Sequence, residues 1–406
     1  MATADHLQDF RIATYPCRVH CGQDALAKLP AEVARQGAKR VFVISGRSVA
    51  TKTDLIDRIR NLLGDTFAGN FDRMGKDSPI EDVLAAADEA RAANAELLIA
   101  VGAGSVIQAV RVVAIALAEK EPLVELATKY PEDGSPAISP KLMARKLPII
   151  NVVTVGTSAQ NRAGSPLKSS EYGRRLEYFD PKTRPVALFW DHDALRTAPR
   201  SMVRASAAAI YWRAVMHLGF TKVTRLTELN RRQVYEIMDN VIRSLDEEDD
   251  IGARVDLCIA TFLQNREVDD GSFRAAHWVM RFNYAFSAGI FNLHEHVSQA
   301  EGNSVLVGTA LRRLGYRDPQ EIANMARILG VWTDKDPIEE APFRAADYLE
   351  KVFADLGLPT RVGQLGLPKS SVDGIMANAL NNFNSDPKQE FKKEPELLRE
   401  ILLEAW

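Results

Sequence analysis

Strand signals fill the first half of this 406-residue chain and stop near its middle. Short, apolar and largely β-branched runs, typical of buried strands, occur at residues 40–44, 97–101, 148–153 and 186–190. Stretches rich in helix-forming residues, such as Ile80–Ala87, separate these runs, which indicates a parallel sheet with crossover helices. From about Pro199 onward only helical periodicity follows. The sequence therefore predicts an α/β domain over residues 1–197 and an all-helical domain over residues 198–406.

Composition excludes several classes of partner. Apolar residues make up 46% of the chain and charged residues 26%, as in an ordinary soluble enzyme. The net charge of −3 disfavours general binding to nucleic acid or to an anionic membrane surface. No window approaches the roughly 20 continuous apolar residues of a membrane span, and the polar start shows no secretory signal. We expect a small-molecule substrate, and neither a nucleic-acid nor a membrane partner.

The three cysteines, Cys17, Cys21 and Cys258, are too few for a disulfide framework and suit a reducing compartment. Residues 17–21 alternate in polarity with a period of two, as a strand with one buried face does. A zinc clip at this place would need two further ligands nearby. We therefore expect a strand here and a cytoplasmic protein.

A glycine-containing turn follows the predicted strand at residues 97–101. Gly102, Gly104 and Ser105 lead into a predicted helix from Val106 to Ala118. Glycines at a strand-to-helix turn let backbone N–H groups approach a phosphate, and the helix N-terminus adds its positive end. Ser105 is expected to cap this helix and to donate to the phosphate. Taken alone, the turn is equally compatible with a tight connection.

Wider similarity favours the phosphate site. Segments that resemble the iron-containing alcohol dehydrogenase and dehydroquinate synthase superfamily are residues 40–47, 100–109, 153–159, 173–191 and 302–308. The N-terminal half is similar in detail to the maleylacetate reductases. The resemblance implies a Rossmann-like α/β domain followed by an all-helical domain, in a dehydroquinate synthase-like fold. It also implies NADP or NAD in the cleft between the domains, and often a homodimer.

The resemblance assigns cofactor contacts to particular residues. It places Gly102, Gly104 and Ser105 at the pyrophosphate, and Thr154 and Thr157 nearer the nicotinamide. These positions follow two of the predicted strands.

Departures from the family pattern bear on the cofactor. The family's middle glycine is Ala103 here, which is tolerable only where no positive φ is needed. Its usual Asp is Gln108, which can hydrogen-bond but carries no charge, and a common Lys is Arg111. Arg47 follows the first predicted strand where an acid would pair with the ribose of NAD. Arg47 would suit the 2′-phosphate of NADP, although a solvated turn arginine is the alternative.

The metal site that the resemblance implies is where the sequence departs furthest. The family holds Fe²⁺ or Zn²⁺ through an acidic residue and two or three histidines of the helical domain, which are usual donors for such ions. The corresponding positions carry Ala209, Arg213, Phe286, Ile290 and Glu301. Alanine offers no donor atom, arginine stays protonated and repels a cation, and one carboxylate is too little. We expect no metal.

Basic residues remain near the expected cleft. Arg213 and Glu301 stand where family donors converge, so a salt bridge could fill the site, or Arg213 could replace the metal's charge towards a carbonyl or carboxylate. Lys168 lies with Arg174 and Arg175 in a region where relatives bind anionic substrates, although an exposed basic loop is equally plausible. Arg213, Glu301 and Lys168 are the candidate catalytic residues.

Other conspicuous residues have structural interpretations. His294 and His296 flank Glu295, but on a helix two residues so spaced point about 200° apart and cannot share one ion. Trp212 is expected to pack, and Asp191 to cap the turn between the domains.

These observations favour a metal-independent, NAD(P)-dependent oxidoreductase acting on a small, anionic carbonyl or alcohol. A non-redox lyase or isomerase using the same cleft is one alternative, and a catalytically silent homologue is another. Binding of NADPH would separate the first hypothesis from the others, because only a working nucleotide loop would bind it.

Overall fold

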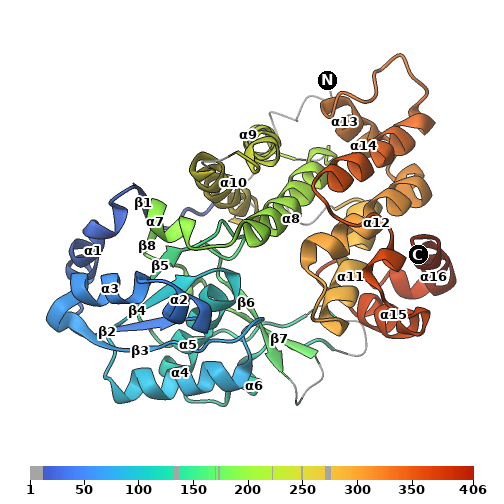
Figure 1. The fold of residues 1–406 in the computed structure, drawn as a ribbon. Coiled ribbons are helices and arrows are strands. Elements are labelled where there is room, and N and C mark those ends of the chain that lie inside the picture. Colours follow the sequence, from blue (N-terminus) through green and yellow to red (C-terminus); the bar gives the residue numbers. More distant parts are fainter. Residues whose placement is uncertain are drawn as a thin grey trace.

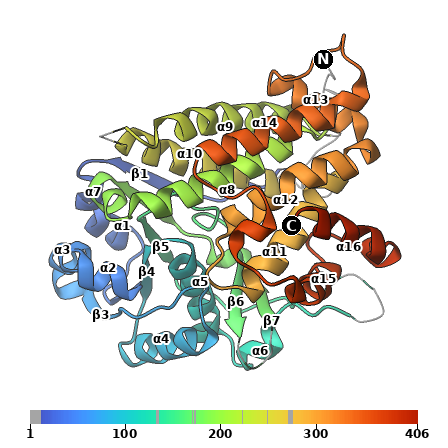
Figure 2. The ribbon, with the colours of Figure 1, turned by 45° about the vertical axis from the view of Figure 1, so that its right-hand side comes forward.

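The computed structural model describes residues 12–131, 135, 137–169, 171, 174–221, 223–247, 250–269 and 276–406. Two parts lie side by side (Figure 1): an α/β part from the first half of the chain and a group of helices from the second half. Rotation by 45° (Figure 2) shows helices α8, α9 and α10 running above the sheet. Within the described residues, no helix combines the length and apolarity that crossing a bilayer requires.

The α/β part is built on a parallel sheet of six strands in the order β1-β8-β5-β4-β2-β3. The strands are β1 (Arg18–Gly22), β2 (Val41–Ser45), β3 (Phe67–Phe71), β4 (Leu97–Gly102), β5 (Ile149–Val153) and β8 (Ala187–Asp191). Strands β2, β4, β5 and β8 are buried along their whole length, because helices cover both faces of the sheet. The predicted strands are confirmed, and so is the Rossmann-like architecture.

Alternate side chains of each strand belong to opposite faces. Val41 and Val43 pack with helices α1 and α3, whereas Phe42 and Ile44 pack with helices α4 and α5. The helices of this part are α1 (Leu29–Arg35), α2 (Arg47–Lys52), α3 (Leu55–Leu63), α4 (Ile80–Ala92), α5 (Gly104–Ala118), α6 (Leu123–Leu126) and α7 (His192–Arg196). A separate antiparallel hairpin, β6 (Gly164–Ser169) and β7 (Arg174–Phe179), projects towards the second part.

The strand predicted at residues 17–21 is confirmed as the edge strand β1, but the expected burial of its cysteine face is not. Cys21 is exposed and Cys17 only partly buried, because β1 pairs with β8 on one side alone. Instead, His20 stacks on Phe189 and lies 3.1 Å from a carboxylate oxygen of Glu32.

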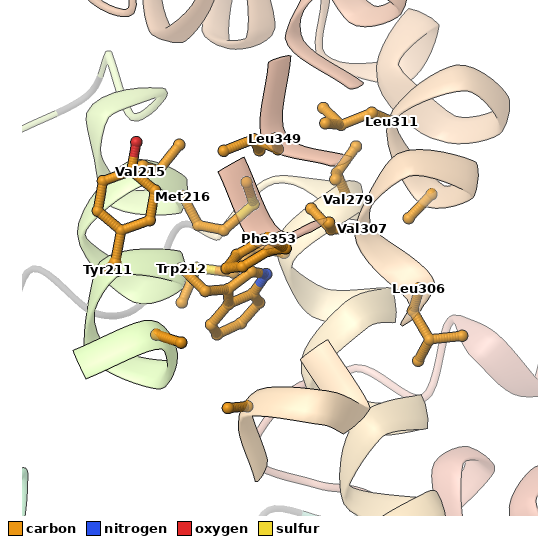
Figure 3. Packing of buried hydrophobic residues seen from close by; sticks show 14 of the residues in the cluster. Tyr211, Trp212, Val215, Met216, Val279, Leu306, Val307, Leu311, Leu349 and Phe353 are labelled. Carbon is orange, nitrogen blue, oxygen red and sulfur yellow. The ribbon is translucent and has the colours of Figure 1, made fainter. Parts of the chain in front are cut away.

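The second part contains only helices in its described residues. They are α8 (Arg200–Leu218), α9 (Arg225–Ser244), α10 (Ile251–Asp269), α11 (Trp278–Leu293), α12 (Gln299–Leu314), α13 (Pro319–Ile328), α14 (Ala341–Asp355), α15 (Val372–Leu380) and α16 (Pro395–Glu404), besides short 3₁₀ turns. Figure 3 shows the core that α8, α12 and α14 share, with Trp212 beside Phe353 and Val307. The indole N–H of Trp212 donates to Asn283 Oδ1 at 2.6 Å, so the packing role predicted for Trp212 is confirmed.

Asp191 closes the α/β part. Its buried carboxylate accepts the backbone N–H of Ala194, at the start of α7, and that of Leu26, both at 3.1 Å. The predicted capping role is therefore confirmed. The domain boundary at residue 197 stays a prediction, placed between α7 and the first long helix, α8.

Candidate functional site

The glycine turn at the end of β4 leaves little room for a side chain at two positions. Gly102 has φ +154°, and a Cβ placed on it would lie 3.0 Å from Val106 Cγ2. A Cβ on Gly104 would lie 3.2 Å from Thr157 Oγ1. Ala103 has φ −98°, so the condition under which this substitution is tolerable is met. The turn therefore keeps the close backbone approach that a pyrophosphate needs.

Ser105 does not cap helix α5, contrary to our expectation. The helix begins at Gly104, so Ala103 is the N-cap residue and supplies no side-chain bond. Ser105 Oγ instead accepts the backbone N–H of Asp77 at 3.0 Å, and Ser78 Oγ donates to the Ser105 carbonyl at 2.6 Å. The Ser105 hydroxyl proton is still available for a ligand, while residues 77 and 78 brace the first helical turn.

The two threonines lie beside this turn. Thr154 is buried, and its backbone N–H donates to the carbonyl of Gly102 at 3.2 Å. Thr157 Oγ1 accepts the N–H of Ala159 at 3.3 Å and faces Gly104. The structure thus brings four of the residues assigned to the cofactor together at the carboxyl ends of β4 and β5.

Gln108 and Arg47 lie farther along the same edge. Gln108 is half-buried on the first turns of α5, and Arg47 is exposed as the first residue of α2, directly after Gly46. Strands β2 and β4 are neighbours, so both helices start at one edge of the sheet. That edge is where open α/β sheets bind nucleotides.

Arg111, which stands where the resemblance places a lysine, is a buried residue that connects two segments of the α/β part. Its guanidinium donates to the carbonyls of Ala159 and Gly164, and to Ser165 Oγ at 3.2 Å. Burial, with a contribution from nearby arginines, lowers the pKa of Arg111 to about 9, which leaves it protonated at neutral pH. Arg111 therefore fastens α5 to the segment that follows Thr157.

The family's donor positions on α8 and α11 carry no metal ligand. Ala209 and Arg213 are half-buried, one turn apart on α8, and Arg213 Nε donates to His217 Nε2 at 3.5 Å. On α11, Phe286 and Ile290 are fully buried, and the ring of Phe286 stacks on Phe282 with centroids 4.1 Å apart. The two positions on α11 to which the resemblance assigns histidines are therefore part of the hydrophobic core.

Glu301 has a structural partner at the start of α12. Its carboxylate accepts the backbone N–H of Ser298 at 2.7 Å, while Ser298 Oγ accepts the N–H of Glu301, which forms a capping box. The Ser-x-x-Glu spacing is the sequence signal that would have predicted this bond. Glu301 also lines a cavity of about 520 Å³ together with His296 and Gln364.

A divalent metal does not fit these residues. A methyl group, a guanidinium and a phenyl ring offer it no donor, and the remaining carboxylate is engaged by Ser298. No group of three or more His, Cys, Asp or Glu residues able to hold an ion occurs in the described part of the chain. Our geometric reason against His294 and His296 was wrong, because α11 ends at Leu293 and their rings lie 6.1 Å apart.

Lys168 joins the two parts of the molecule. Its Nζ forms an ion pair with the carboxylate of Glu295, just beyond α11, and Lys76 Nζ donates to the Glu295 carbonyl at 2.5 Å. The guanidinium of Arg175 lies 5.5 Å from the ring centroid of Phe291, while the side chain of Arg174 lies outside the described residues. Sequence reasoning missed Glu295 and Lys76, because no local pattern links residues so far apart.

Comparisons with known proteins agree with this geometry. A family model described as iron-containing alcohol dehydrogenase matches residues 16–192. Long-chain-alcohol dehydrogenase 1 of Geobacillus thermodenitrificans is 22% identical over 383 residues, which cover 90% of this chain and 89% of that protein. Maleylacetate reductase 2 of Cupriavidus pinatubonensis is 38% identical over 124 residues, covering 30% of this chain and 33% of that protein.

The solved structures agree in fold. An alcohol dehydrogenase from Oenococcus oeni superposes with a TM-score of 0.83 at 17% identity, covering 98% of this chain and 100% of the other. The two parts of this chain therefore have the same fold as that structure. Residues 16–192 thus resemble an iron-containing alcohol dehydrogenase domain, and the similarity to a dehydrogenase of this kind extends at 22% identity over 90% of the chain.

Proposed function

We propose that this protein is an oxidoreductase that uses NADP or NAD without a catalytic metal. Its substrate is a small, anionic carbonyl or alcohol compound bound between the two parts. One observation carries the proposal. The turn at Gly102 and Gly104 keeps its close backbone approach, while the donor positions of the helical part carry Ala209, Arg213 and Phe286.

The cofactor would lie along the carboxyl edge of the sheet. Gly102, Gly104 and Ser105 would hold the pyrophosphate, at the N-terminus of the 15-residue helix α5. Thr154 and Thr157 would flank the nicotinamide ring, which supplies the hydride when the cofactor is bound. The protein's own contribution is to orient that ring towards the helical part.

Two further residues bear on cofactor choice. Gln108 would hydrogen-bond without adding a negative charge, and Arg47 would meet a 2′-phosphate from its exposed place at the start of α2. Replacement of Arg47 with Ala is therefore expected to weaken NADPH binding several-fold and to leave NADH binding nearly unchanged. Equal effects on both nucleotides would remove the argument for NADP.

Arg213 is proposed to supply the positive charge that the family takes from its metal. A guanidinium on α8 can bind a carboxylate in a bidentate manner or polarise a carbonyl oxygen. R213A should lower turnover by about 10²-fold if Arg213 acts on the reacting oxygen. Unchanged turnover in a folded R213A variant would leave Arg213 only a space-filling role, with or without Glu301.

Lys168 would bind an anionic substrate only if the substrate displaces Glu295 from the ion pair. Its ion pair with Glu295 is solvated, with 42% and 68% of the two side chains exposed, and such exposed pairs contribute little to stability. A substrate carboxylate could therefore replace Glu295 as the partner of Lys168 at little cost.

The decisive experiment begins with the cofactor. NADPH and NADH are added separately to protein purified without added metal, and fluorescence enhancement and the shift in Tm are measured. We expect micromolar binding of at least one of them, followed by oxidation of that nucleotide with small aldehydes or 2-oxo acids. Binding without oxidation would contradict the proposed substrate class, and no binding would favour the lyase or isomerase alternative or a silent homologue. A stoichiometric, tightly held Fe or Zn that is required for turnover would overturn the metal-independent mechanism.

A further inference from the structure

Gln160 is a fully buried amide at the contact between the two parts. Its Nε2 donates to the carbonyl of Cys258 at 2.7 Å and to Thr261 Oγ1 at 2.5 Å, both on α10. Its Oε1 accepts the indole N–H of Trp190, at the end of β8, at 2.8 Å. The backbone carbonyl of Gln160 in turn accepts Asn151 Nδ2, on β5, at 2.8 Å. One residue therefore joins two central strands to a helix of the other part.

The segment before Gln160 carries the threonines assigned to the nicotinamide. The N–H of Gln160 donates to the carbonyl of Thr157 at 3.1 Å, so the two residues share one turn. Gly156 packs directly on α10, since a Cβ placed there would lie 2.8 Å from the backbone nitrogen of Cys258. Asn265 of α10 also donates to the carbonyl of Ser158 at 3.0 Å. The position of Thr157 against Gly104 is thus set by α10.

We propose that Gln160 is a positioning residue, which fixes the turn of Thr154 and Thr157 on α10 and so shapes the nicotinamide end of the cofactor site. This inference rests on the proposed function, because it assumes that the turn receives a nicotinamide. Gln160 acts through Thr157 and does not contact the cofactor. The pyrophosphate turn at Gly102 and Gly104 belongs to β4 and α5, so Gln160 acts on it only indirectly, through the contacts of Thr154 and Thr157.

The chemistry of the amide explains why a substitution is costly. All of its hydrogen-bonding groups are engaged by buried partners, so Q160L leaves the Trp190 N–H without an acceptor. The same variant releases the turn from α10. A milder variant, T261V, keeps the shape of the helix and of Gln160 but removes one acceptor of the amide.

The chain offers a matched control on α10. Gln264 is also fully buried, and neither polar atom of its amide has a hydrogen-bond partner among the described residues. Q264L removes an equally buried amide from the same helix without cutting a bond to the turn. It should leave nucleotide binding unchanged and hold or raise the Tm.

The test compares a whole cofactor with its nicotinamide-free fragment. Dissociation constants are measured for NADPH and for 2′-phospho-ADP-ribose, or for NADH and ADP-ribose if the wild-type protein prefers NAD. We expect Q160L to weaken the whole cofactor about ten-fold and T261V about three-fold, with the fragment changed less than two-fold in both.

A general loss of structure would weaken cofactor and fragment alike, and that result, or unchanged cofactor binding by both variants, would overturn the positioning role. Should Q160L not fold, T261V decides by the same comparison. If the wild-type protein binds neither cofactor nor fragment, the proposed function fails instead.

Discussion

The candidate sites in the two halves of this molecule are built from different parts of the chain. The nucleotide turn of the α/β half is made by backbone groups and small residues, so that Ala103 can replace a glycine at φ −98° without closing the site. At the positions to which the resemblance assigns metal ligands, Ala209, Arg213 and Phe286 carry no donor for a metal, and the carboxylate of Glu301 caps its own helix. A site built from backbone tolerates substitutions that abolish a site built from side chains.

The experiment with the largest expected effect rebuilds the metal site that the resemblance implies. If only side chains were lost, the combination A209D, R213H, F286H and E301H should restore an acidic residue and three histidines in the family's arrangement. We expect Zn²⁺ binding with a Kd of about 1 μM or tighter, equivalent to about 8 kcal/mol. Calorimetry and metal analysis after dialysis would measure it.

The control for the rebuilt site carries only R213H and E301H. With too few donors to compete with water, this protein should lose its zinc on dialysis. A folded quadruple variant that binds no zinc would mean that the helices themselves have shifted, and the comparison between side chains and backbone would then be wrong.

A second test addresses the backbone-made site. In G102A, the added methyl would meet Val106 at 3.0 Å and would force a residue other than glycine to φ +154°. We expect NADPH affinity to fall roughly 30-fold or more, from strain of about 2–3 kcal/mol. Fluorescence titration of NADPH gives the measurement.

The matched glycine of the helical half is Gly302. A methyl on Gly302 would lie 3.2 Å from the Cβ of Ser287, so G302A should lower the Tm through overpacking of α11 against α12 while NADPH affinity stays constant. Equal losses of NADPH binding in G102A and G302A would show that the nucleotide site is not confined to the α/β half.

The sequence predicted those parts of the fold that depend on local pattern. Continuous apolar runs revealed β2, β4, β5 and β8, but β3, Phe-Ala-Gly-Asn-Phe, was missed because Gly69 and Asn70 disfavour strands. The hairpin β6–β7 was missed because Gly164 and Pro166 resemble a loop. Each of these elements is defined by its neighbours in space rather than by its own composition.

The residues of the candidate site were predictable or not for the same reason. The turn at Gly102 was predictable because its glycines are adjacent in sequence. Gln160 and Glu295 were not, because their partners lie 98 and 127 residues away, at Cys258 and Lys168. Contacts of that range follow from how the two halves pack, which one sequence does not reveal.

A smaller effect is expected inside the helical half, where α12 and α14 are joined by Glu350. Burial alone would raise the pKa of Glu350, but hydrogen bonds from Arg312 and Arg361 outweigh it and hold the pKa below 4.5. The stabilisation is therefore present above pH 4.5 and is lost as the pH falls through the lowered pKa. E350Q should reduce the free energy of unfolding by about 1 kcal/mol at pH 7, and the difference should shrink in acid.

Urea titrations from pH 7 down to pH 3 would measure this difference, with D355N as the control. Asp355 pairs with Lys351 on the same helix, but both side chains are mostly exposed, so D355N should change little at any pH. NADPH binding should be unaltered in both variants. A loss of NADPH affinity in E350Q would show that the contact between α12 and α14 affects the nucleotide site. The two halves would then be less independent than the comparison assumes.

The smallest effect on stability is expected where the halves meet in solvent, at Lys168 and Glu295. Because both side chains are substantially exposed, K168A and E295Q should each change the Tm very little. Kinetics should separate the two variants. If Lys168 binds a substrate anion, K168A raises KM for anionic substrates and not for neutral ones, whereas E295Q lowers it by removing the competing carboxylate. If KM changes in the same direction in both variants, the ion pair only holds the two halves together. Arg213 would then be the one remaining argument for an anionic substrate.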